Sequence, residues 1–411
     1  MGLIFYTVGV QFYLLIVIIF SLWNKKAKLF IDGRKNIFEK ISNKLLNNSK
    51  KLVWFHCSSL GEFEQARPVI EGFKLKHPEY FIFLTFFSPS GYEVRKNYEL
   101  ADAIFYLPID SKKNAHQLIQ LINPSIVYFV KYDFWYYYLH ELKNRHTNTI
   151  LFSANFRENQ LFFKPYGHFY RQMLFSFNHI FVQNTFSAKL LENIGYKNVT
   201  VAGDTRFDRV IENVKNKKSI PLAEKFKNNK NVLIIGSSWE EDMEIIIPLI
   251  NQFPHEIKYI IAPHEIKENF ISDIENKIKK KSIRFSKADL QTIDNYDVLI
   301  IDNVGMLSSL YQYGEFAYVG GGFKQGLHNI LEPSAFGLPV IFGPEKDFQR
   351  FPEAKELLNL NGATTVSNFD ELNNIVLKLY QSEPYRQEMA KVVKNYILNG
   401  TGATEKILLW Q

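Results

Sequence analysis

The sequence contains very little cysteine, too little for a disulfide or a site with several cysteine ligands. A single cysteine, Cys57, in 411 residues excludes an internal disulfide framework and is typical of a reducing compartment. Because Cys57 lies in an apolar run, we expect a buried structural thiol and not a nucleophile. No Cys/His cluster has the spacing of a zinc site, so we predict no metal.

Charge is also missing from one long stretch. No side chain between Gly2 and Asn24 is charged, and Leu3–Trp23 is almost wholly apolar. About 20 residues at about 1.5 Å per residue span roughly 30 Å, the thickness of a bilayer core. A cleaved signal peptide would have basic residues before the apolar run, whereas here the lysines follow it. A buried helix is the alternative, but a helix that is apolar on every face is seldom found at an N-terminus. We therefore predict an uncleaved membrane-anchor helix over residues 1–23, with the remaining chain on the cytoplasmic side.

The positive charge of the chain is confined to the segment that follows. Residues 24–51 contain nine Lys or Arg and two acidic residues, Asp32 and Glu39, which equals the whole net charge of +7. The folded remainder is formally neutral, which argues against nucleic acid as a partner. A local basic segment beside an apolar helix instead favours contact with an anionic membrane surface.

The length and composition predict two domains with large cores. The chain has 411 residues, of which 46% are hydrophobic and 15% aromatic. Short apolar runs alternate with amphipathic stretches, a pattern that favours parallel sheets covered by helices on both faces. The pattern is interrupted where Lys and Asn crowd around Pro221. We therefore predict α/β architecture with two doubly wound, Rossmann-like domains and a cleft between them. The domains cover 24–212 and 231–411, with a linker over 213–230.

Two series of strands are expected. The first contains Leu52–Cys57, Tyr80–Phe86, Ala103–Leu107, Ile126–Val130, Thr149–Ser153 and His179–Val182. The second contains Asn231–Gly236, Lys258–Ala262, Asp297–Ile301, Phe316–Val319, Pro339–Phe342 and Ala363–Val366. The tail from Glu383 to Gln411 has a helical pattern. In such sheets ligands bind beyond the carboxyl ends of the strands, so the loops that follow strands are the places to look for a site.

The most informative loop follows Phe316–Val319. It contains three glycines, Gly320–Gly322, and then His-Asn-x-x-Glu-Pro at 328–333, where a helix is expected near Asn329. Bare backbone N–H groups and a helix N-terminus suit a phosphate, and the Glu332 carboxylate suits paired sugar hydroxyls. The loop therefore predicts a site for a nucleotide joined to another group.

Three loops of the first half contain candidate polar residues, each with a structural alternative. Glu62 follows the first strand and is either an acid that stabilises a helix end or a general base. Lys131 and Asp133 follow the fourth strand and form either an exposed pair or a holder for an anionic substrate. Arg206 either forms a surface pair with an aspartate or reaches a phosphate as a bidentate donor.

Further loops of the second half follow strands in the same way. Gly236–Asp242 is either an anion-binding turn that includes Ser237 or a helix cap at Ser238. Pro263 and His264 follow the next strand, and the amides near Gly305 could bind a phosphate or a base.

Taken in this order, the motifs resemble the Kdo transferase family, which builds lipopolysaccharide in Gram-negative bacteria. The likeness runs nearly end to end and includes the anchor, Ser59-x-Gly61-Glu62, Gly236-Ser237-x-x-x-Glu241, Ala262-Pro263, Asp302…Gly305, Gly320-Gly321…Phe323, His328-Asn329-x-x-Glu332 and Gly343-Pro344. The resemblance implies a GT-B glycosyltransferase that moves Kdo, an acidic eight-carbon sugar, from CMP-Kdo to a lipid A precursor similar to lipid IVA. It implies inversion at the anomeric carbon and neither a metal nor a cofactor besides the donor.

The resemblance also implies roles for individual residues. The catalytic base falls on Glu62, and the basic residue that stabilises the phosphate falls on Arg206. CMP contacts fall on Pro263, His264, Val304, Gly305, Met306, Asn329, Ile330, Leu331 and Glu332, and the loops that meet the phosphate contain Ser237, Gly321 and Gly322.

The chain departs from the family pattern at three points. Lys131 stands where relatives have an acid, and Asp133 is the candidate to take over part of its role. Pro263-His264-Glu265 replaces Pro-Arg-His, and Leu327 replaces a glycine before His328. Two other functions therefore stay open: a GT-B transferase with a UDP-hexose donor, and a membrane-tethered sensor of nucleotide sugars without catalysis.

Overall fold

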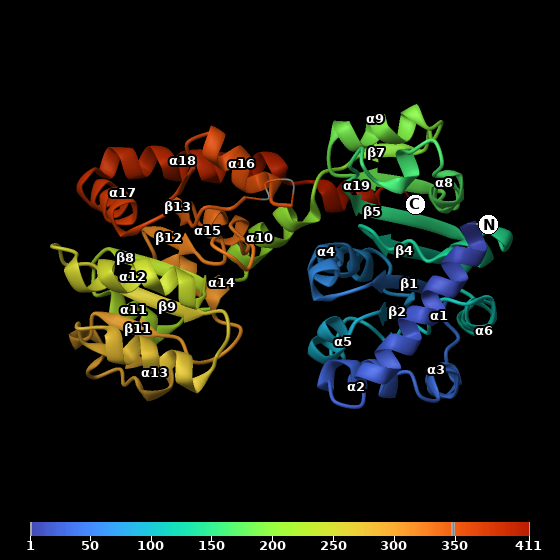
Figure 1. Ribbon diagram of the computed structural model, residues 1–411, viewed down its shortest axis with the longest axis horizontal. Helices are drawn as coiled ribbons and strands as arrows, with labels where there is room; N and C mark the ends of the chain where they lie inside the picture. The colour runs from blue at the N-terminus through green and yellow to red at the C-terminus, as the bar shows by residue number, and fades with distance from the viewer. Residues whose placement is uncertain (1, 347, 349, 411) are drawn as a thin grey trace. The chain divides into compact units, whose positions relative to one another are not determined.

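The protein folds into two compact units, each a parallel α/β structure (Figure 1). The computed structural model describes residues 2–346, 348 and 350–410. Met1 and Gln411, the outer ends of the predicted domains, lie outside the described residues. The first unit runs to Arg209 and takes up the chain again at Thr401, and the second is Val210–Gly400. The predicted α/β class with two doubly wound domains is confirmed, and the cleft between them stays a prediction.

Within the described residues, the first unit is built on a seven-stranded parallel sheet in the order β3-β2-β1-β4-β5-β6-β7. Its strands are β1 (Leu52–Cys57), β2 (Phe81–Phe86), β3 (Ala103–Tyr106), β4 (Ile126–Val130), β5 (Asn148–Ala154), β6 (His179–Val182) and β7 (Val199–Val201). Its helices are α1 (Gly2–Phe20), α2 (Lys25–Asp32), α3 (Ile37–Leu45), α4 (Leu60–Lys76), α5 (Pro89–Arg95), α6 (Lys112–Ile122), α7 (Tyr136–Asn144), α8 (His168–Leu174), α9 (Thr185–Asn193), the start of α10 (Thr205–Lys215) and α19 (Ala403–Leu408).

The second unit holds another seven-stranded parallel sheet among its described residues, in the order β10-β11-β9-β8-β12-β13-β14. Its strands are β8 (Val232–Ser238), β9 (Lys258–Pro263), β10 (Ser282–Arg284), β11 (Val298–Ile300), β12 (Phe316–Val319), β13 (Val340–Phe342) and β14 (Ala363–Thr365). Its helices are the rest of α10, α11 (Pro221–Lys227), α12 (Glu240–Gln252), α13 (Glu268–Lys277), α14 (Leu307–Leu310), α15 (Leu331–Ala335), α16 (Pro352–Asn359), α17 (Phe369–Gln381) and α18 (Glu383–Gly400).

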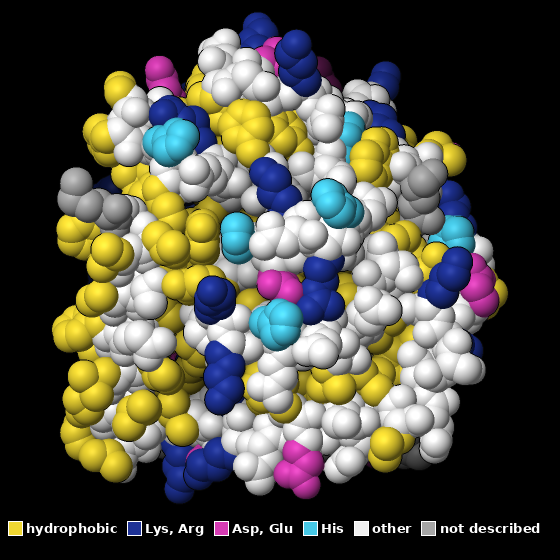
Figure 2. Space-filling model, turned by 90° about the vertical axis from the view of Figure 1, so that its right-hand side faces the viewer, with side chains coloured by type: hydrophobic (Ala, Val, Ile, Leu, Met, Phe, Trp, Pro, Cys, Tyr) yellow, Lys and Arg dark blue, Asp and Glu magenta, His cyan; other side chains and the backbone are white. Residues whose placement is uncertain are grey.

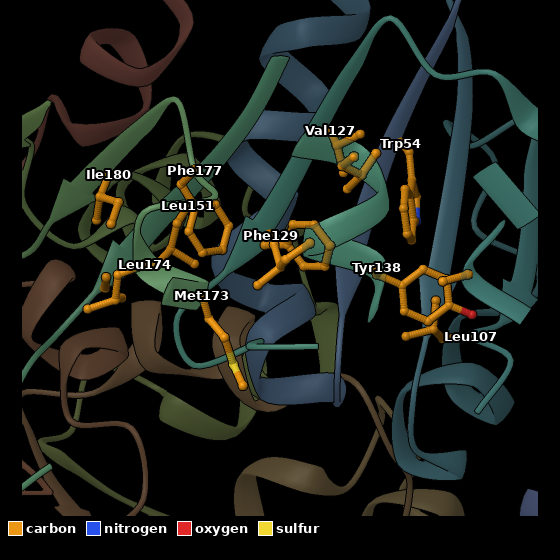
Figure 3. Close-up of a cluster of buried hydrophobic side chains, with 14 of the residues drawn as sticks. Trp54, Leu107, Val127, Phe129, Tyr138, Leu151, Met173, Leu174, Phe177 and Ile180 are labelled. Atoms are coloured by element: carbon orange, nitrogen blue, oxygen red, sulfur yellow. The ribbon is translucent and has the colours of Figure 1, made fainter. Parts of the chain in front are cut away.

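Alternation along each central strand builds a separate core on each face of the sheet. In β1, Leu52 and Trp54 belong to one buried cluster, whereas Val53 and Phe55 belong to the other. Both faces are covered by helices, so the strand is apolar throughout, as expected for a parallel sheet. Figure 3 shows the first of these cores, in which Trp54, Phe129 and other strand residues meet side chains from the helices.

Helix α1 packs one of its faces against the first unit. Its half-buried residues recur at helical spacing, namely Gly2, Tyr6, Thr7, Val10, Leu14, Val17 and Ser21. The Tyr6 hydroxyl donates a hydrogen bond to the buried Asp110 carboxylate, and the Tyr137 hydroxyl lies 2.6 Å from Thr7 Oγ1. The opposite face of the helix is apolar and exposed. α1 is the one helix of the described chain that is long and apolar enough to cross a membrane.

The unit boundaries differ from the predicted domains at two places. Residues 401–410, predicted in the second domain, belong to the first unit because Ala403, Ile407 and Leu408 are buried in its core. Gly402, at a φ of +99°, separates α18 from α19 and breaks the predicted continuous helix. The predicted linker contains α11, whose Phe226 is buried in the core of the second unit. Sequence periodicity did not reveal α11, because its few apolar residues are surrounded by Lys and Asn.

Candidate functional site

The first candidate site lies where the strand order of the first sheet reverses. β1 and β4 are neighbours there, and the chain proceeds outward from them in opposite directions. The loops after these two strands therefore meet at the same carboxyl edge, the usual place for a ligand in a doubly wound sheet. These loops contain Ser58–Glu62 and Lys131–Trp135.

Glu62 lies in the first turn of α4, half-buried, as the sequence predicts. Ser59, the residue at the N-cap position, donates a side-chain hydrogen bond to Glu62 Oε2. The carboxylate is therefore held by its own turn and at the positive end of the helix dipole. This arrangement presents an oriented carboxylate that water and a substrate can reach.

Asp133 occupies a different environment, because its side chain lies behind the turn that carries Glu62. It is 4% exposed and accepts hydrogen bonds from the Ser58 hydroxyl and, at 3.2 Å, from the Ser58 N–H. Burial raises the pKa of Asp133 well above its usual value, although the bonds from Ser58 oppose this shift. The aspartate thus ties the loop after β4 to the loop after β1. Its predicted catalytic role stays a prediction.

His56 is a structural residue of this edge. Trp135 Nε1 donates to His56 Nε2 at 3.0 Å, so the proton of the neutral ring is on Nδ1, which lies 2.8 Å from Thr85 Oγ1. Burial lowers the pKa of His56 to about 3, so the ring is neutral near pH 7. Its 3.9 Å approach to Asp133 is therefore no ion pair.

Further charged residues gather around Tyr132, the residue before Asp133. The Tyr132 hydroxyl donates to the Asn155 carbonyl at 2.7 Å. Burial raises its pKa, while Arg157 and Arg206 act in the opposite direction and Asp204 and Glu62 act with burial. Glu62 and Arg206, which follow β1 and β7, thus both influence the pKa of Tyr132, which follows β4. Lys131 follows β4 in a left-handed conformation, at a φ of +62°, with its Nζ 5.6 Å from the centre of the Tyr132 ring.

Arg206 is oriented by an aspartate, as the structural alternative predicts. Its Nε lies 2.8 Å and its NH2 group 2.7 Å from Asp204 Oδ2, and its backbone N–H donates to Asp204 Oδ1 at 2.9 Å. Asp204 is buried, whereas Arg206 is half-buried. A guanidinium held in this way is a fixed cation at the edge of the sheet, which is compatible with binding an anion.

The second candidate site lies at the corresponding reversal of the second sheet, between β8 and β12. Its central residue is Asp242 on α12, which is 1% exposed. The Asp242 carboxylate accepts from the Tyr318 hydroxyl at 2.8 Å, the Trp239 N–H at 2.9 Å and the Gly321 N–H at 3.0 Å. Burial raises the pKa of Asp242, and these three donors oppose the shift. Asp242 thus joins the loop after β8 to the glycine loop after β12.

The glycines of that loop make a close backbone contact, a role different from the predicted phosphate cradle. A Cβ at Gly320 would lie 2.4 Å from the Ser237 carbonyl oxygen, and one at Gly322 would lie 2.6 Å from that of Gly343. Gly321 has a φ of +94°, which favours glycine. Its N–H is already bonded to Asp242, so this amide does not point bare toward a phosphate. Ser237 supplies the backbone against which Gly320 packs.

Three rings form an ordered stack beside these loops. Trp239 Nε1 donates to His328 Nε2 at 2.8 Å, and the planes of the two rings are nearly parallel, at 11°. His264 lies over both, with ring centroids 4.5 Å from Trp239 and 4.3 Å from His328. Burial, followed by the neighbouring His264, lowers the pKa of His328 to about 4. His264 is exposed, so its ring is accessible to a ligand beside Pro263, the buried last residue of β9.

The predicted nucleotide segment 329–332 lies at the start of α15. This helix begins at Leu331, two residues after Asn329 and so near the predicted start, and Asn329 Oδ1 accepts the Leu331 N–H at 3.1 Å. Asn329 Nδ2 also lies 3.2 Å from Glu332 Oε1. Ile330 and Leu331 are buried, so of the four residues Asn329 and Glu332 are those that a ligand can reach.

The loop after β11 adds the other predicted contacts. Val304 is 87% exposed and Gly305 has a φ of +88°, immediately before α14. Met306 is half-buried and packs on the core of the unit. Because β11, β9, β8 and β12 are consecutive in the sheet, this loop lies at the same edge as His264 and Glu332.

Sequence reasoning did not assign roles to Asp242, Trp239 or Asp204. The sequence does contain a signal for Asp242: an acid three residues after Trp239 has the spacing of a capping box at the start of a helix. No group of three or more His, Cys, Asp or Glu in the described part of the chain could hold a metal ion.

The chain is similar to known proteins over most of its length. Residues 34–209 match the family described as 3-deoxy-D-manno-octulosonic-acid transferase (kdotransferase). The 3-deoxy-D-manno-octulosonic acid transferase of Haemophilus influenzae is 27% identical over 87% of this chain and 85% of its own length. That of Aquifex aeolicus is 27% identical over 89% of this chain and 95% of its own length.

Solved structures share the fold at lower identity. UDP-GlcNAc 2-epimerase from Neisseria meningitidis has a TM-score of 0.60 and 16% identity, over 88% of this chain and 98% of its own. MurG from Acinetobacter baumannii has a TM-score of 0.56 and 12% identity, over 87% of this chain and 98% of its own. These likenesses show the GT-B type of architecture, two doubly wound units in one chain.

Proposed function

Because this chain belongs to the Kdo transferase family of glycosyltransferases, we propose that it transfers Kdo from CMP-Kdo to a lipid A precursor similar to lipid IVA. The relatives named as 3-deoxy-D-manno-octulosonic acid transferases match over most of their length. In this proposal the reaction inverts the anomeric carbon, requires no metal or separate cofactor, and contributes to the core of lipopolysaccharide.

The observation that carries the proposal is the environment of Glu62. It is a half-buried carboxylate at the reversal point of the first sheet, and Ser59 orients it. A general base needs both a fixed position and access to the proton that it removes. Asp133, by contrast, is enclosed.

In the proposed reaction, Glu62 accepts the proton of the acceptor hydroxyl as the oxygen bonds to the anomeric carbon of Kdo. The bond between that carbon and the phosphate oxygen of CMP breaks, and its electron pair leaves with CMP. Arg206, held by Asp204, stabilises the charge on the leaving phosphate. Attack on the face opposite the leaving group inverts the configuration.

The second unit binds the nucleotide in this proposal. The Glu332 carboxylate accepts hydrogen bonds from the ribose hydroxyls, beside Asn329. The exposed ring of His264 offers an aromatic face for the cytosine base, since its other face lies on Trp239 and His328. Val304–Met306 line the same edge.

We further propose that the protein works at the cytoplasmic face of the inner membrane. The apolar exposed face of α1 and the basic segment 24–51 support this location, because they suit hydrocarbon and anionic head groups. An amphiphilic acceptor is found at the same surface.

The direct test is to incubate the purified protein with CMP-Kdo and a tetraacylated lipid A precursor and to weigh the product. A mass gain of one or more Kdo units with release of CMP is the expected result. Binding of CMP and UDP, measured in parallel, identifies the donor class. Tight UDP binding with turnover of a UDP-hexose would overturn the choice of donor, and nucleotide binding without turnover of any donor would indicate a sensor.

A further inference from the structure

A groove between α1 and the body of the first unit has no role in the function so far described. Its cavity measures about 470 Å³, within the roughly 300–1,000 Å³ of ordinary ligand sites. Half of its lining residues, including Tyr6, Gly9 and Val10, come from one face of α1. The other wall includes Phe87 and Trp135.

The lining of the groove is mainly apolar, and its one acidic residue, Asp110, already accepts hydrogen bonds from the protein. Asp110 accepts hydrogen bonds from the Tyr6 hydroxyl, the Tyr137 N–H at 3.1 Å and the Tyr138 N–H at 3.2 Å. The lining contains no lysine or arginine. Such a groove offers little to a charged or sugar-like ligand and favours a hydrocarbon.

One end of the groove reaches the candidate site in the first unit. Trp135 is two residues from Asp133, its ring centre lies 4.4 Å from that of Phe87 at a tilt of 36°, and its indole N–H donates to His56. A ligand against Trp135 therefore lies beside the edge of the sheet where Glu62 is presented.

The other side of the groove is continuous with an apolar surface. Phe5, which lines the groove, is 73% exposed, and the outward residues of α1 are exposed hydrophobic side chains. Figure 2 shows hydrophobic side chains gathered along its left edge. In this docked position α1 contacts Asp110 through Tyr6 and turns its exposed apolar face outward, a surface that suits the acyl region of a membrane.

We propose that this groove receives one hydrocarbon chain of the lipid acceptor and so positions its sugar hydroxyl near Glu62. The inference rests on the proposed function, which supplies an acylated acceptor. Hydrocarbon from α1, the membrane and the acceptor then forms one continuous apolar phase, and the head group alone extends to the site. A chain buried in the groove would contribute to acceptor recognition without touching the reacting atoms.

The test uses the shortage of cysteine in this chain. Cys57 is fully buried, so a thiol introduced at the surface is the one that a maleimide modifies quickly. Gly9→Cys places that thiol in the groove, where an added Cβ meets nothing within 4 Å. The matched control is Val8→Cys on the outward face, since Val8 is 61% exposed and is not part of the groove.

Modification rates are measured on the full-length protein in detergent with the tetraacylated precursor or with its fully deacylated disaccharide. With the acylated precursor at about ten times its half-saturating concentration, Gly9→Cys should react about tenfold more slowly, because few sites remain empty. Val8→Cys should react at its unprotected rate. Equal protection by the deacylated compound, or by phospholipid vesicles without acceptor, would overturn the proposal.

A second variant tests the groove by filling it. Gly9→Phe should lower the ratio of kcat/KM for acylated over deacylated acceptor by about tenfold, the loss for one or two methylenes that lose their burial. An unchanged ratio in a folded protein would overturn the proposal. If the unmodified protein transfers no Kdo at all, the proposed function fails instead, and the thiol protection still reports whether the groove binds a chain.

Discussion

Replacing Glu62 by glutamine tests whether Glu62 accepts a proton in the reaction or only stabilises the start of a helix. Glutamine keeps the shape of the side chain, and its amide oxygen can still accept the hydrogen bond from Ser59. It cannot take up a proton. An acid in the first turn of a helix contributes about 0.3–1 kcal/mol through the helix dipole, so the free energy of unfolding should fall by no more than about that amount. Turnover should fall by at least about 100-fold, the lower range for a positioned general base.

The assay measures turnover of CMP-Kdo, CMP binding and melting temperature on the same preparation. CMP affinity should change little, because the residues proposed to bind it belong to the second unit. Glu64→Gln is the matched control, since Glu64 is an acid of the same helix whose Oε1 pairs with Arg95 at 2.7 Å, and this variant should keep its turnover. A folded Glu62→Gln protein with near-normal turnover would refute the assignment of Glu62 as the base.

Three further substitutions test other parts of the two units. Glu332→Ala should weaken CMP binding by about 1.5–3 kcal/mol, as for a lost hydrogen bond to a charged group, and unchanged affinity in calorimetry would reject its contact with the ribose. Gly320→Ala should destabilise the second unit by about 1–3 kcal/mol, because its Cβ would lie 2.4 Å from the Ser237 carbonyl oxygen. Gly61→Ala is the control: its Cβ would have only Ser59 Oγ, at 3.7 Å, within contact distance, and the melting temperature should not change. The pKa of buried His56 is lowered to about 3, so between that pH and about 6.5 the unfolded chain binds a proton that the folded chain does not. The contribution of neutral His56 to the free energy of unfolding is therefore fully present above that pH window. It falls as the pH drops through the window, by up to about 1.4 kcal/mol per pH unit. His56→Gln should reduce this pH dependence of the free energy of unfolding, measured by chemical denaturation at several pH values.

The strands that sequence periodicity located best are the central ones. β1, β4, β6 and β12 have the predicted bounds, because each is a short apolar run with turn residues on both sides. The edge strands β7 and β10 were missed, since each has three residues and at most one of them is buried. An edge strand has few buried positions, so its pattern is hard to tell from that of a loop.

The limits of the units could not be predicted in the same way. Ile407 follows the second unit in the chain but packs in the core of the first unit, on the layer that contains α4. Local periodicity does not reveal where the chain returns in space. The residues that line the site could be placed at the carboxyl ends of strands from the order of elements alone. How exposed each of these residues is could not be predicted from the sequence, because burial depends on the neighbouring loops.

That difference matters most for the acids. In each unit a buried carboxylate lies behind the loops at the reversal point and accepts backbone N–H groups from the neighbouring turn: Asp133 from Ser58 in the first unit, and Asp242 from Trp239 and Gly321 in the second. Burial raises the pKa of both acids, and the loops they hold present Glu62 and the glycine turn. In the sequence, Asp133 and Glu62 are equally polar residues that follow a strand. The structure distinguishes them by what each carboxylate contacts: Asp133 is enclosed by the backbone that it orders, whereas Glu62 is held by one serine and remains accessible to an acceptor.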